Sequence, residues 1–285
     1  MIKFCKNSTI YTYKIYWGDF MEIYNLKEML FPYEQAVKEL TLKFDSIKNE
    51  YRMLGMYSPI EAVTGRVKKM SSILEKASRK KISPDEIRDK IEDIAGIRIL
   101  CQFVEDIQKV IDLVRERDGR DLFIEEERDY ITNTKPSGYR SYHIIVRYPL
   151  NTAMGYIEVP AEIQIRTLSM NFWAVTEHSL KYKYSGNIPM DLQKRLINCA
   201  EAAFKLDEEM GTIREEIMHA QRLNEVKNNL LNDIIENMHN LYFNAKVEEM
   251  DEINRKFVDL WEEGDLDRLR EFNQQLNIMT EVYRA

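Results

Sequence analysis

The residues best suited to chemistry lie in one ten-residue stretch, 158–167, which reads EVPAEIQIRT. Glu162, Gln164 and Arg166 alternate there with small or branched apolar residues. A period of two is typical of a β-strand with one apolar face and one polar face. An acid, an amide and a guanidinium in a row could hold a metal ion, a hydroxyl and a phosphate. An ordinary antiparallel strand with a solvated outer face would show the same alternation, and on this stretch alone that interpretation is favoured.

A second carboxylate that could join this site belongs to Asp93. The pattern places Asp93 at the end of a helix that begins with Ser83 and Pro84, just before a buried-type strand at 97–103. Two carboxylates from separate elements are what Mg²⁺ requires when it also binds phosphate oxygens. Acids at helix ends often face solvent, so either carboxylate alone is a weak signal.

A basic helix face is predicted within residues 67–80. At spacings of four, four and three it carries Lys68, Ser72, Lys76 and Arg79. Such a face could bind a triphosphate through charge-assisted hydrogen bonds, although a solvated basic face is the plainer interpretation. Arg66 and Arg98 flank this region, and their guanidinium planes could stack on a purine or pair with surface acids.

A further polar group follows the loop at 133–138. Lys135 beside a glycine could bind phosphates, Tyr139 could stack on a base, and His143 could donate a hydrogen bond to a phosphate. Ordinary turn residues and a core tyrosine would explain the same segment about equally well.

The helix predicted at 171–182 presents an amide and a carboxylate on one face. Asn171 and Glu177 could bind the polar edge of guanine, whereas Trp173 and Leu180 are assigned to the core. Their spacing predicts that they share a surface but does not say what that surface binds.

The elements that position these residues alternate between helix and strand, with periods of 3.6 and two. Helices are predicted at 33–54, 67–80, 83–93, 106–116 and 171–182, strands at 97–103, 122–131, 139–148 and 158–167, and a short turn or strand at 60–67. The predicted fold class is α+β: a mixed sheet of about five strands flanked by helices, with long N- and C-terminal helices.

The C-terminal third is predicted to be helical throughout. Nine apolar residues from Leu192 to Ala220 repeat at spacings of four and three, which is a heptad seam. The segment 223–241 continues it less regularly. Two short amphipathic helices then follow, separated at Gly264, with Asp265 as the expected N-cap.

Composition and charge narrow the classes of function. The 285-residue chain has a net charge of −7, which argues against a general nucleic-acid binder, so RNA binding is possible but not indicated by charge. Residues 206–285 carry 19 acidic and nine basic side chains, a net charge of −10. The basic residues that phosphate chemistry needs are therefore in the first two thirds of the chain.

Targeting signals and cysteine usage favour the cytoplasm. No apolar run approaches the ~20 residues of a membrane span, and the first twenty residues lack the apolar segment of a secretory signal. The three cysteines are Cys5, Cys101 and Cys199, too far apart and too few for a disulfide framework or a zinc site, which fits a reducing compartment.

Six motifs in a fixed order carry a resemblance to a known family. They are GRVK at 65–68, DIAGIR at 93–98, RDYI at 128–131, KPSGYRSYH at 135–143, EIQIRT at 162–167 and NFWAVTEHSLKYKYSG at 171–186. Over residues 33–221 the chain resembles the synthetase domain of the RelA/SpoT family, and within it the RelQ-like small alarmone synthetases. This predicts an N-terminal extension at 1–32, a nucleotidyltransferase-like alarmone synthetase domain at 33–221, and a helical acidic C-terminal extension at 222–285.

The resemblance implies a GTP pyrophosphokinase of the stringent response, which moves the β,γ-pyrophosphate of ATP to the 3′-hydroxyl of GTP or GDP and makes (p)ppGpp with AMP as by-product. By similarity, ATP would be bound by Arg66, Lys68, Ser72, Lys76, Arg79 and Arg98, with Arg66 and Arg98 on either side of the adenine. GTP or GDP would be bound by Arg128, Lys135, Tyr139, His143, Gln164, Asn171 and Glu177, with Tyr139 stacked on guanine. The catalytic residues would be Asp93 and Glu162, which would both bind Mg²⁺, and Glu162 would also be the base for the 3′-hydroxyl.

Two features depart from the RelQ-like pattern. An allosteric pppGpp cleft in that group uses basic and aromatic residues where this chain has Thr41, Asp45 and Ala62, and an acid there would repel a polyphosphate. The chain also continues about sixty residues beyond the usual end, so the expected homotetramer carries an additional segment. None of the four histidines is followed by Asp, so the family's hydrolase signature is absent and we expect synthesis only.

Two rival functions stay open at this point. One is a toxin-type synthetase that pyrophosphorylates the 3′ end of tRNA, which would need a basic surface for the acceptor stem. The other is a catalytically inactive regulator that binds nucleotide or RNA, against which the intact Asp93, Glu162 and Tyr139 argue. The preference between GTP and GDP does not follow from the sequence.

Overall fold

The computed structural model describes residues 2–6, 9–13, 28–153, 155–183, 188–243 and 247–284. The chain divides into two compact units, residues 1–211 and 212–285. Most of the N-terminal extension expected at 1–32 lies outside the described residues. Among those that are described, β1 (Ile2–Lys6) and β2 (Thr9–Tyr13) form an antiparallel hairpin.

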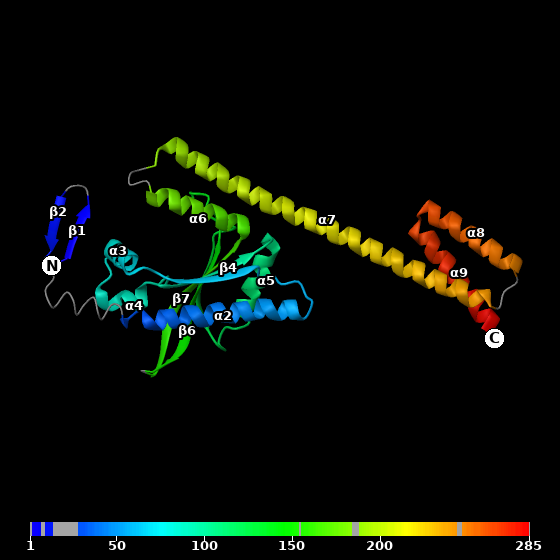
Figure 1. Cartoon of the computed structure of the whole chain (residues 1–285), viewed down its shortest axis with the longest axis horizontal. Helices are drawn as coiled ribbons and strands as arrows, with labels where there is room; N and C mark the ends of the chain where they lie inside the picture. The colour runs from blue at the N-terminus through cyan, green and yellow to red at the C-terminus, as the bar shows by residue number, and fades with distance from the viewer. Residues whose placement is uncertain are drawn as a thin grey trace. The chain divides into compact units, whose positions relative to one another are not determined.

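The first unit is organised by a five-stranded mixed sheet (Figure 1). In spatial order its strands are β3 (Ala62–Val67), β4 (Ala95–Cys101), β7 (Gly155–Thr167), β6 (Tyr142–Thr152) and β5 (Phe123–Asp129). The pair β4–β7 is parallel and the other three pairs are antiparallel. The predicted α+β fold with a mixed sheet of about five strands is confirmed.

The alternating pattern of β7 gives the strand one buried apolar face and one polar face, as predicted. Ala161, Ile163 and Ile165 are buried in the main hydrophobic core. The alternate residues form the opposite face of the strand, and their register with the neighbouring strands fixes which side chains they meet. One cross-strand row from β3 to β5 consists of Thr64, Arg98, Gln164, His143 and Arg128. The adjacent row consists of Arg66, Gly96, Glu162, Ile145 and Glu126.

Helices complete the first unit. They are α2 (Phe31–Met53), α3 (Met70–Lys80), the 3₁₀ turn η1 (Pro84–Glu86) with α4 (Ile87–Lys90), α5 (Val104–Arg115), α6 (Leu168–Lys183) and the first part of α7 (Met190–Tyr242). The apolar side of α2, including Tyr33, Leu40 and Phe44, is fully buried against the sheet. The face that carries Glu162 is therefore left for polar residues, because the core occupies the other one.

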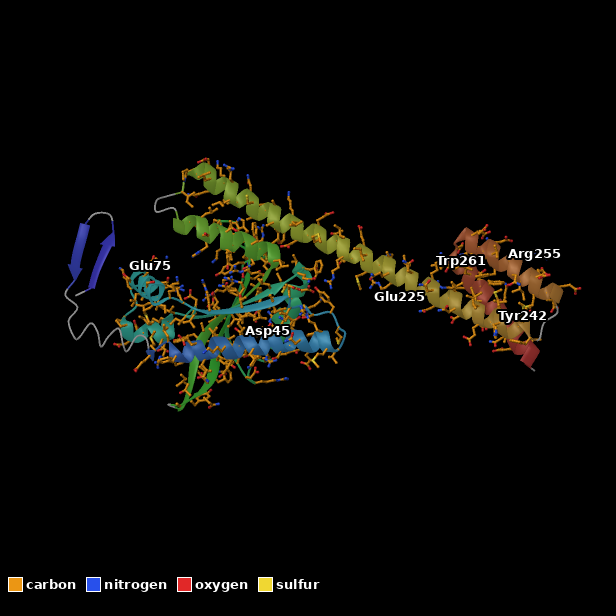
Figure 2. All side chains as sticks on the ribbon, in the orientation of Figure 1. Asp45, Glu75, Glu225, Tyr242, Arg255 and Trp261 are labelled. Carbon is orange, nitrogen blue, oxygen red and sulfur yellow. The ribbon has the colours of Figure 1, made fainter. Side chains whose placement is uncertain are left out.

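The second unit has a core of its own. It combines the end of α7 with α8 (Val247–Glu263) and α9 (Leu266–Arg284). Its buried residues are Leu230, Ile234, Leu241, Met250, Ile253, Leu260, Leu269, Phe272 and Leu276. Trp261 lies on α8 (Figure 2). Nζ of Lys227 on α7 lies 4.4 Å from the centroid of its ring. Asp265 caps α9 as predicted, since its Oδ1 accepts the backbone N–H groups of Asp267 and Arg268 at 2.9 and 3.2 Å.

Two predicted helices are shorter than the sequence pattern indicated. The helix expected from Val67 begins only at Met70, because Val67 still pairs with Ala95 in the sheet, so Lys68 lies outside the helix that was expected to carry it. The helix expected to reach Asp93 ends at Lys90, because Ile91 adopts an extended backbone and is fully buried. Asp93 consequently lies in the turn before β4 rather than at a helix end.

Two apolar assignments were also wrong. The spacing of Val67, Met70, Leu74 and Ala77 predicts an apolar stripe on the helix expected at 67–80, but Leu74 is 43% exposed and Ile73 fills the core under α3 instead. Leu180, expected in the core, is 49% exposed, whereas Trp173 on the same helix is buried as predicted. In the part of the chain that the structure describes, none of the helices combines the length and hydropathy of a membrane span.

Candidate active site

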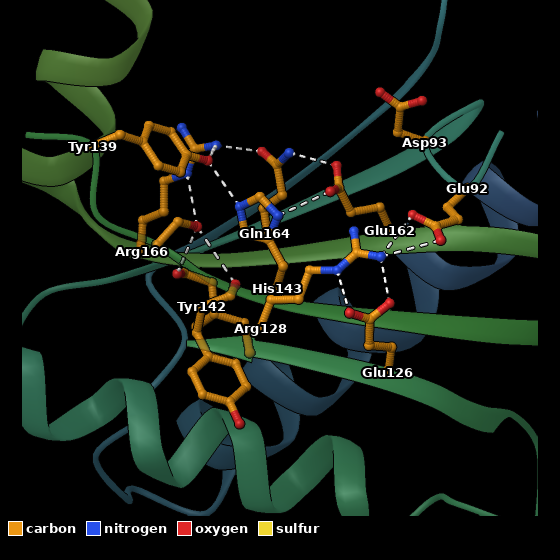
Figure 3. A network of polar contacts seen from close by, with 12 residues as sticks. Glu92, Asp93, Glu126, Arg128, Tyr139, Tyr142, His143, Glu162, Gln164 and Arg166 are labelled. Carbon is orange, nitrogen blue, oxygen red and sulfur yellow. Dashed lines mark hydrogen bonds and ion pairs between the residues drawn. The ribbon is translucent and has the colours of Figure 1, made fainter. Parts of the chain in front are cut away.

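Glu162 lies at the centre of the polar face of β7, with both carboxylate oxygens engaged (Figure 3). Its Oε1 is 2.9 Å from Nδ1 of His143 on the neighbouring strand β6. Its Oε2 accepts a hydrogen bond of 2.7 Å from Nε2 of Gln164, two residues along β7. The register of the sheet therefore fixes the position of this carboxylate from two strands.

These contacts belong to a closed ring of five side chains. Nε2 of His143 is 2.8 Å from the hydroxyl of Tyr139, and Nη2 of Arg166 donates to that hydroxyl at 2.8 Å. The same nitrogen of Arg166 donates to Oε1 of Gln164, which closes the ring. A guanidinium can only donate, so the amide oxygen of Gln164 faces Arg166 and its NH₂ group faces Glu162. Each of the five side chains thus has two hydrogen-bonded neighbours in the ring.

The electrostatic balance keeps Glu162 ionised. Burial would raise the pKa of this carboxyl, but the hydrogen bonds and charge interaction from His143, together with Gln164, outweigh it and hold the pKa below 4.5, its ordinary value. An ionised carboxylate held on a rigid strand can accept a proton at neutral pH. Tyr139 shows the opposite effect, since burial raises the pKa of its hydroxyl and keeps it protonated.

Asp93 lies at the edge of the same site and is held by two lysines. Its Oδ2 is 2.7 Å from Nζ of Lys68 and its Oδ1 is 2.8 Å from Nζ of Lys76. Burial would raise the pKa of Asp93, yet the two ammonium groups lower it below the ordinary value. Lys68 and Lys76 therefore meet at Asp93, one from the segment before α3 and one from the helix itself.

Asp93 and Glu162 open into one cavity of about 220 Å³, which Arg66 and Arg98 also line. Gly96 separates Arg66 from Glu162 in the cross-strand row, so no side chain fills the space between them. No group of three or more His, Cys, Asp or Glu side chains suited to a metal occurs among the described residues. Two carboxylates beside open space fit Mg²⁺, which usually takes one or two carboxylates and completes its shell with waters and phosphate oxygens.

A neighbouring cavity of about 360 Å³ contains three arginines. Arg66, Arg98 and Arg166 line it together with Tyr139, Gln164 and Glu177. Burial, followed by repulsion from Arg166 and Arg66, lowers the pKa of Arg98. Within the described ranges none of the three arginines forms an ion pair with a carboxylate of the chain. Arg166 is buried, Arg98 half-buried and Arg66 exposed. Guanidinium groups without such partners beside a cavity favour an anionic or π-rich ligand.

Lys135 points at two aromatic rings on the other side of the site. Its Nζ lies 4.0 Å from the ring centroid of Tyr130 and 5.0 Å from that of Tyr139. Burial is the main reason that its pKa is lowered. Tyr130 also meets the ring of His143 edge-on at a centroid distance of 5.1 Å. Lys135, Tyr139 and His143, predicted as acceptor-binding residues, are thus brought together by the structure.

The remaining predicted residues are less tightly joined to the site. Arg128 is neutralised by Glu126 at 2.7 Å and by Glu92 at 3.0 Å, at the edge of the polar face. Glu177 lines the arginine-rich cavity and pairs with Lys181. Asn171 has a buried Oδ1 without a hydrogen-bond partner among the described atoms. Ser72 is half-buried and Arg79 exposed on α3, and neither lines the two cavities.

Comparison with known proteins decides the family. Residues 65–187 match the model described as "Region found in RelA / SpoT proteins". The chain is 54% identical over 195 residues to the GTP pyrophosphokinase YjbM of Bacillus subtilis, an alignment that covers 68% of this chain and 91% of that protein. The chain belongs to the RelA/SpoT family.

Two further comparisons agree with this RelA/SpoT assignment. GTP pyrophosphokinase YwaC, also of Bacillus subtilis, is 41% identical over 193 residues, covering 67% of this chain and 91% of that protein. The crystal structure of the small alarmone synthetase 1 from Bacillus subtilis bound to its product pppGpp superposes with a TM-score of 0.65 at 53% identity. That match covers 68% of this chain and 98% of the solved one, so the resemblance inferred from the motifs is confirmed.

Sequence reasoning missed two residues of this RelA/SpoT site, Tyr130 and Glu92. It placed Arg166 on the polar face of the strand, but it did not predict that this side chain, only 4% exposed, closes the hydrogen-bonded ring. Tyr130 supports Lys135 and His143, and Glu92 neutralises Arg128. Tyr130 lies in the motif RDYI, but nothing in the sequence pattern showed that its ring would meet Lys135 of the following loop and His143 of β6.

Proposed function

We propose that this protein is a GTP pyrophosphokinase that makes (p)ppGpp from ATP and GTP or GDP. The observation that carries the proposal is an ionised, doubly hydrogen-bonded Glu162 that shares a cavity with the lysine-bound Asp93. Relatives named GTP pyrophosphokinase, aligned over nine tenths of their length, support the same activity. The solved relative bound to pppGpp supports a guanosine polyphosphate as the product.

On the donor side, the proposed ATP site is the cationic surface around Asp93. Arg66 and Arg98 stack on the adenine, and Lys68 and Lys76 transfer from Asp93 to the phosphate oxygens when the nucleotide binds. Ser72 and Arg79 on α3 extend this surface toward the polyphosphate. Pyrophosphoryl transfer depends mainly on positioning and on neutralising charge, which is the contribution that these cations make.

On the acceptor side, Tyr139 stacks on guanine, and Asn171 with Glu177 binds the polar edge of the base. Lys135 and His143 bind the acceptor phosphates, Gln164 lies beside the ribose, and Arg128 supports the phosphate site from the sheet edge. These roles use the cluster of Lys135, Tyr139 and His143 that packs around Tyr130.

The proposed reaction forms one bond and breaks one. The 3′-oxygen of the acceptor attacks the β-phosphorus of ATP, the bond from that phosphorus to the α-phosphate bridging oxygen breaks, and AMP leaves. Glu162 accepts the proton of the 3′-hydroxyl. Asp93 and Glu162 would hold Mg²⁺, which would supply positive charge that neutralises the phosphates during transfer.

We propose that the protein is a cytoplasmic homotetramer that synthesises (p)ppGpp and does not hydrolyse it. Activation by pppGpp is not part of the proposal, because Thr41, Asp45 and Ala62 stand where the RelQ-like cleft has basic and aromatic residues. Transfer to the 3′ end of tRNA is the rival that the same chemistry would allow, and neither the net charge of −7 nor the named relatives favour it.

One assay tests the proposal. The protein is incubated with ATP labelled in the γ-phosphate, Mg²⁺ and one acceptor at a time: GTP, GDP or uncharged tRNA. We expect labelled pppGpp from GTP and labelled ppGpp from GDP, with one AMP formed for each product molecule. Label in tRNA but not in the nucleotides would contradict the proposal, and no transfer to any acceptor would favour an inactive regulator.

A further inference from the structure

The loop that carries Tyr139 packs directly against helix α7. Gly138 has a left-handed backbone (φ 86°), and a Cβ there would lie 2.6 Å from Cβ of Ala200 on α7. Only glycine combines this backbone with such a close approach. The loop and the helix are therefore in direct backbone-level contact at the residue immediately before Tyr139.

The residue immediately after Tyr139 is fixed from the same helix. Arg140 is buried, and its Nη2 lies 2.9 Å from Oε1 of Glu201 on α7. Its guanidinium also stacks over the ring of Phe204, one helical turn further on, at 4.5 Å from the ring centroid. A buried guanidinium requires a charged partner, so Glu201 determines where this part of the loop can lie.

The ring of Tyr139 itself packs in a small cluster that α7 helps to build. Trp173 and Ala174 of α6 and Ala200 of α7 form its buried part, and Tyr139 packs against them. Nε1 of Trp173 donates to the backbone oxygen of Leu196 at 2.9 Å, which ties α6 to α7 at this cluster. All three consecutive loop residues, 138–140, are thus positioned by α7.

The junction of the loop, α6 and α7 also encloses space. A cavity of about 430 Å³ is lined by Pro136 and Ser137 of the loop, by Glu177 of α6, and by Leu196 and Ile197 of α7. Glu177 lines this cavity and the arginine-rich cavity as well. The beginning of α7 is therefore a wall next to the proposed guanine site.

We propose that Arg140 and Glu201 are positioning residues for the acceptor nucleotide, and that α7 sets acceptor affinity through them. The inference rests on the proposed function of Tyr139 as the residue that stacks on guanine. Neither Arg140 nor Glu201 lines the cavity that Asp93 and Glu162 share. Loosening the pair lets Tyr139 move away from its stacking position and leaves the ATP site unchanged.

The test measures KM separately for the two nucleotides. Glu201→Gln, at a side chain that is half exposed, should raise the KM for GTP about two- to fivefold, with the KM for ATP and kcat little changed. Glu201→Asp, which keeps the charge, should recover part of the loss. Arg140→Gln should raise the KM for GTP more, and the double variant Arg140→Gln/Glu201→Gln should be no worse than Arg140→Gln alone, because both remove one contact.

Two comparisons keep the result interpretable. Glu209→Gln, on the exposed surface of the same helix, should change neither KM and controls for the loss of one charge. Tyr139→Ala tests the underlying site. If Tyr139→Ala raises the KM for GTP and Glu201→Gln does not, the positioning role is wrong and the site assignment stands. If Tyr139→Ala leaves the KM for GTP unchanged, the proposed guanine site fails first. Equal rises in both KM values for Glu201→Gln would also overturn the inference.

Discussion

At the scale of single residues, the ring around Glu162 explains how a buried carboxylate can act as a base. Its oxygens receive hydrogen bonds from β6 and from β7, so the side chain does not have to be ordered when the substrate binds. Preorganised polar groups in a closed network contribute more than isolated ones, because none needs to reorient during the reaction. The first prediction follows from this arrangement.

Glu162→Gln should retain the fold and lose turnover by at least about 10²-fold, since an amide cannot accept the 3′-hydroxyl proton. Glu158→Gln is the matched control, because Glu158 lies on the same strand and is exposed. It should have normal turnover. Initial rates at saturating ATP and GTP measure both variants, and near-normal turnover in Glu162→Gln would contradict the assignment of the base.

The hydrogen bond from His143 makes a pH-dependent prediction. The deprotonated form of Glu162 is the active base, and its pKa is held below 4.5, so its protonation should reduce kcat only below that pH. His143→Phe removes the interaction that lowers this pKa and leaves the effect of burial, which raises it. The acid limb of the kcat–pH profile should therefore move to higher pH. An unmoved limb with a raised acceptor KM would assign His143 to phosphate binding alone.

Tyr139 should distinguish the two nucleotide sites. Tyr139→Ala should weaken acceptor binding by roughly 1 to 3 kcal/mol, the range for base–aromatic stacking, with little effect on ATP. Tyr139→Phe keeps the ring and removes the hydroxyl that Arg166 and His143 contact. It should bind GTP nearly normally and lower kcat. Weaker ATP binding with unchanged GTP binding would mean that donor and acceptor sites are interchanged.

At the scale of elements, the sequence pattern correctly predicted features that depend only on neighbouring residues. The alternation in 158–167 predicted a two-faced strand and placed Glu162 and Gln164 on one face, because that period depends only on neighbouring residues. Lys68 and Asp93 were misplaced at helix ends, since pairing of Val67 with Ala95 and burial of Ile91 are tertiary effects that outweigh helix propensity.

What the sequence pattern could not supply was the order of the strands. His143 and Gln164 face each other only because β6 is adjacent to β7, and Arg98 joins them only because β4 lies on the other side. The family resemblance supplied this indirectly, by naming residues from several motifs as one site. The place of Arg166 in the hydrogen-bonded ring could be found only from the side-chain contacts of the structure.

The junction between β7 and α7 makes a stability prediction at this scale. Asp207 of α7 is buried and accepts a hydrogen bond of 2.6 Å from Oγ1 of Thr167. Burial raises its pKa above the ordinary value of 3.8. A raised folded-state pKa favours folding below the unfolded-state pKa, and that contribution is lost as pH rises through the folded-state pKa. The ionised Asp207 therefore destabilises the folded chain at neutral pH.

Asp207→Asn can still accept from Thr167 without a buried charge. We expect its melting temperature to exceed that of the unchanged protein at pH 7, with the difference shrinking as the pH falls toward 4. Glu209→Gln, exposed on the same helix, should show no such trend. Thermal unfolding followed by circular dichroism across this pH range measures the effect, and a less stable Asp207→Asn at pH 7 would refute it.

At the scale of the whole molecule, α7 carries apolar residues that the single chain leaves in contact with water. Leu206 is 55% exposed, Met210 46% and Ile217 53%, and all three belong to the predicted heptad seam. Burying a Leu-sized side chain contributes roughly 1.5 to 3 kcal/mol, and a row of exposed ones is costly in a monomer. The seam is therefore the surface that we expect to join subunits, in a homotetramer first and a dimer next.

A charged substitution in the seam tests this without shortening the chain. Leu206→Glu/Ile217→Glu should dissociate the assembly into smaller species, because two charges cannot be buried in an apolar interface without partners. Lys205→Glu, at an exposed neighbouring position, controls for added negative charge. Light scattering at micromolar concentration measures the mass. A monomeric mass for the unchanged protein would rule out the oligomer altogether.

The second unit gives the complementary experiment. Residues of α8 and α9 form a separate hydrophobic core with Leu230, Ile234 and Leu241 of α7. Burial of this core stabilises the second unit without any contact between subunits. A chain truncated after Ala245 should keep its oligomeric mass if the seam is the interface. The same truncation with Leu230→Gln, Ile234→Gln and Leu241→Gln controls for the apolar surface that loss of α8 and α9 uncovers. Truncated chains that separate into monomers in both versions would show that the C-terminal unit, and not the seam, joins the subunits.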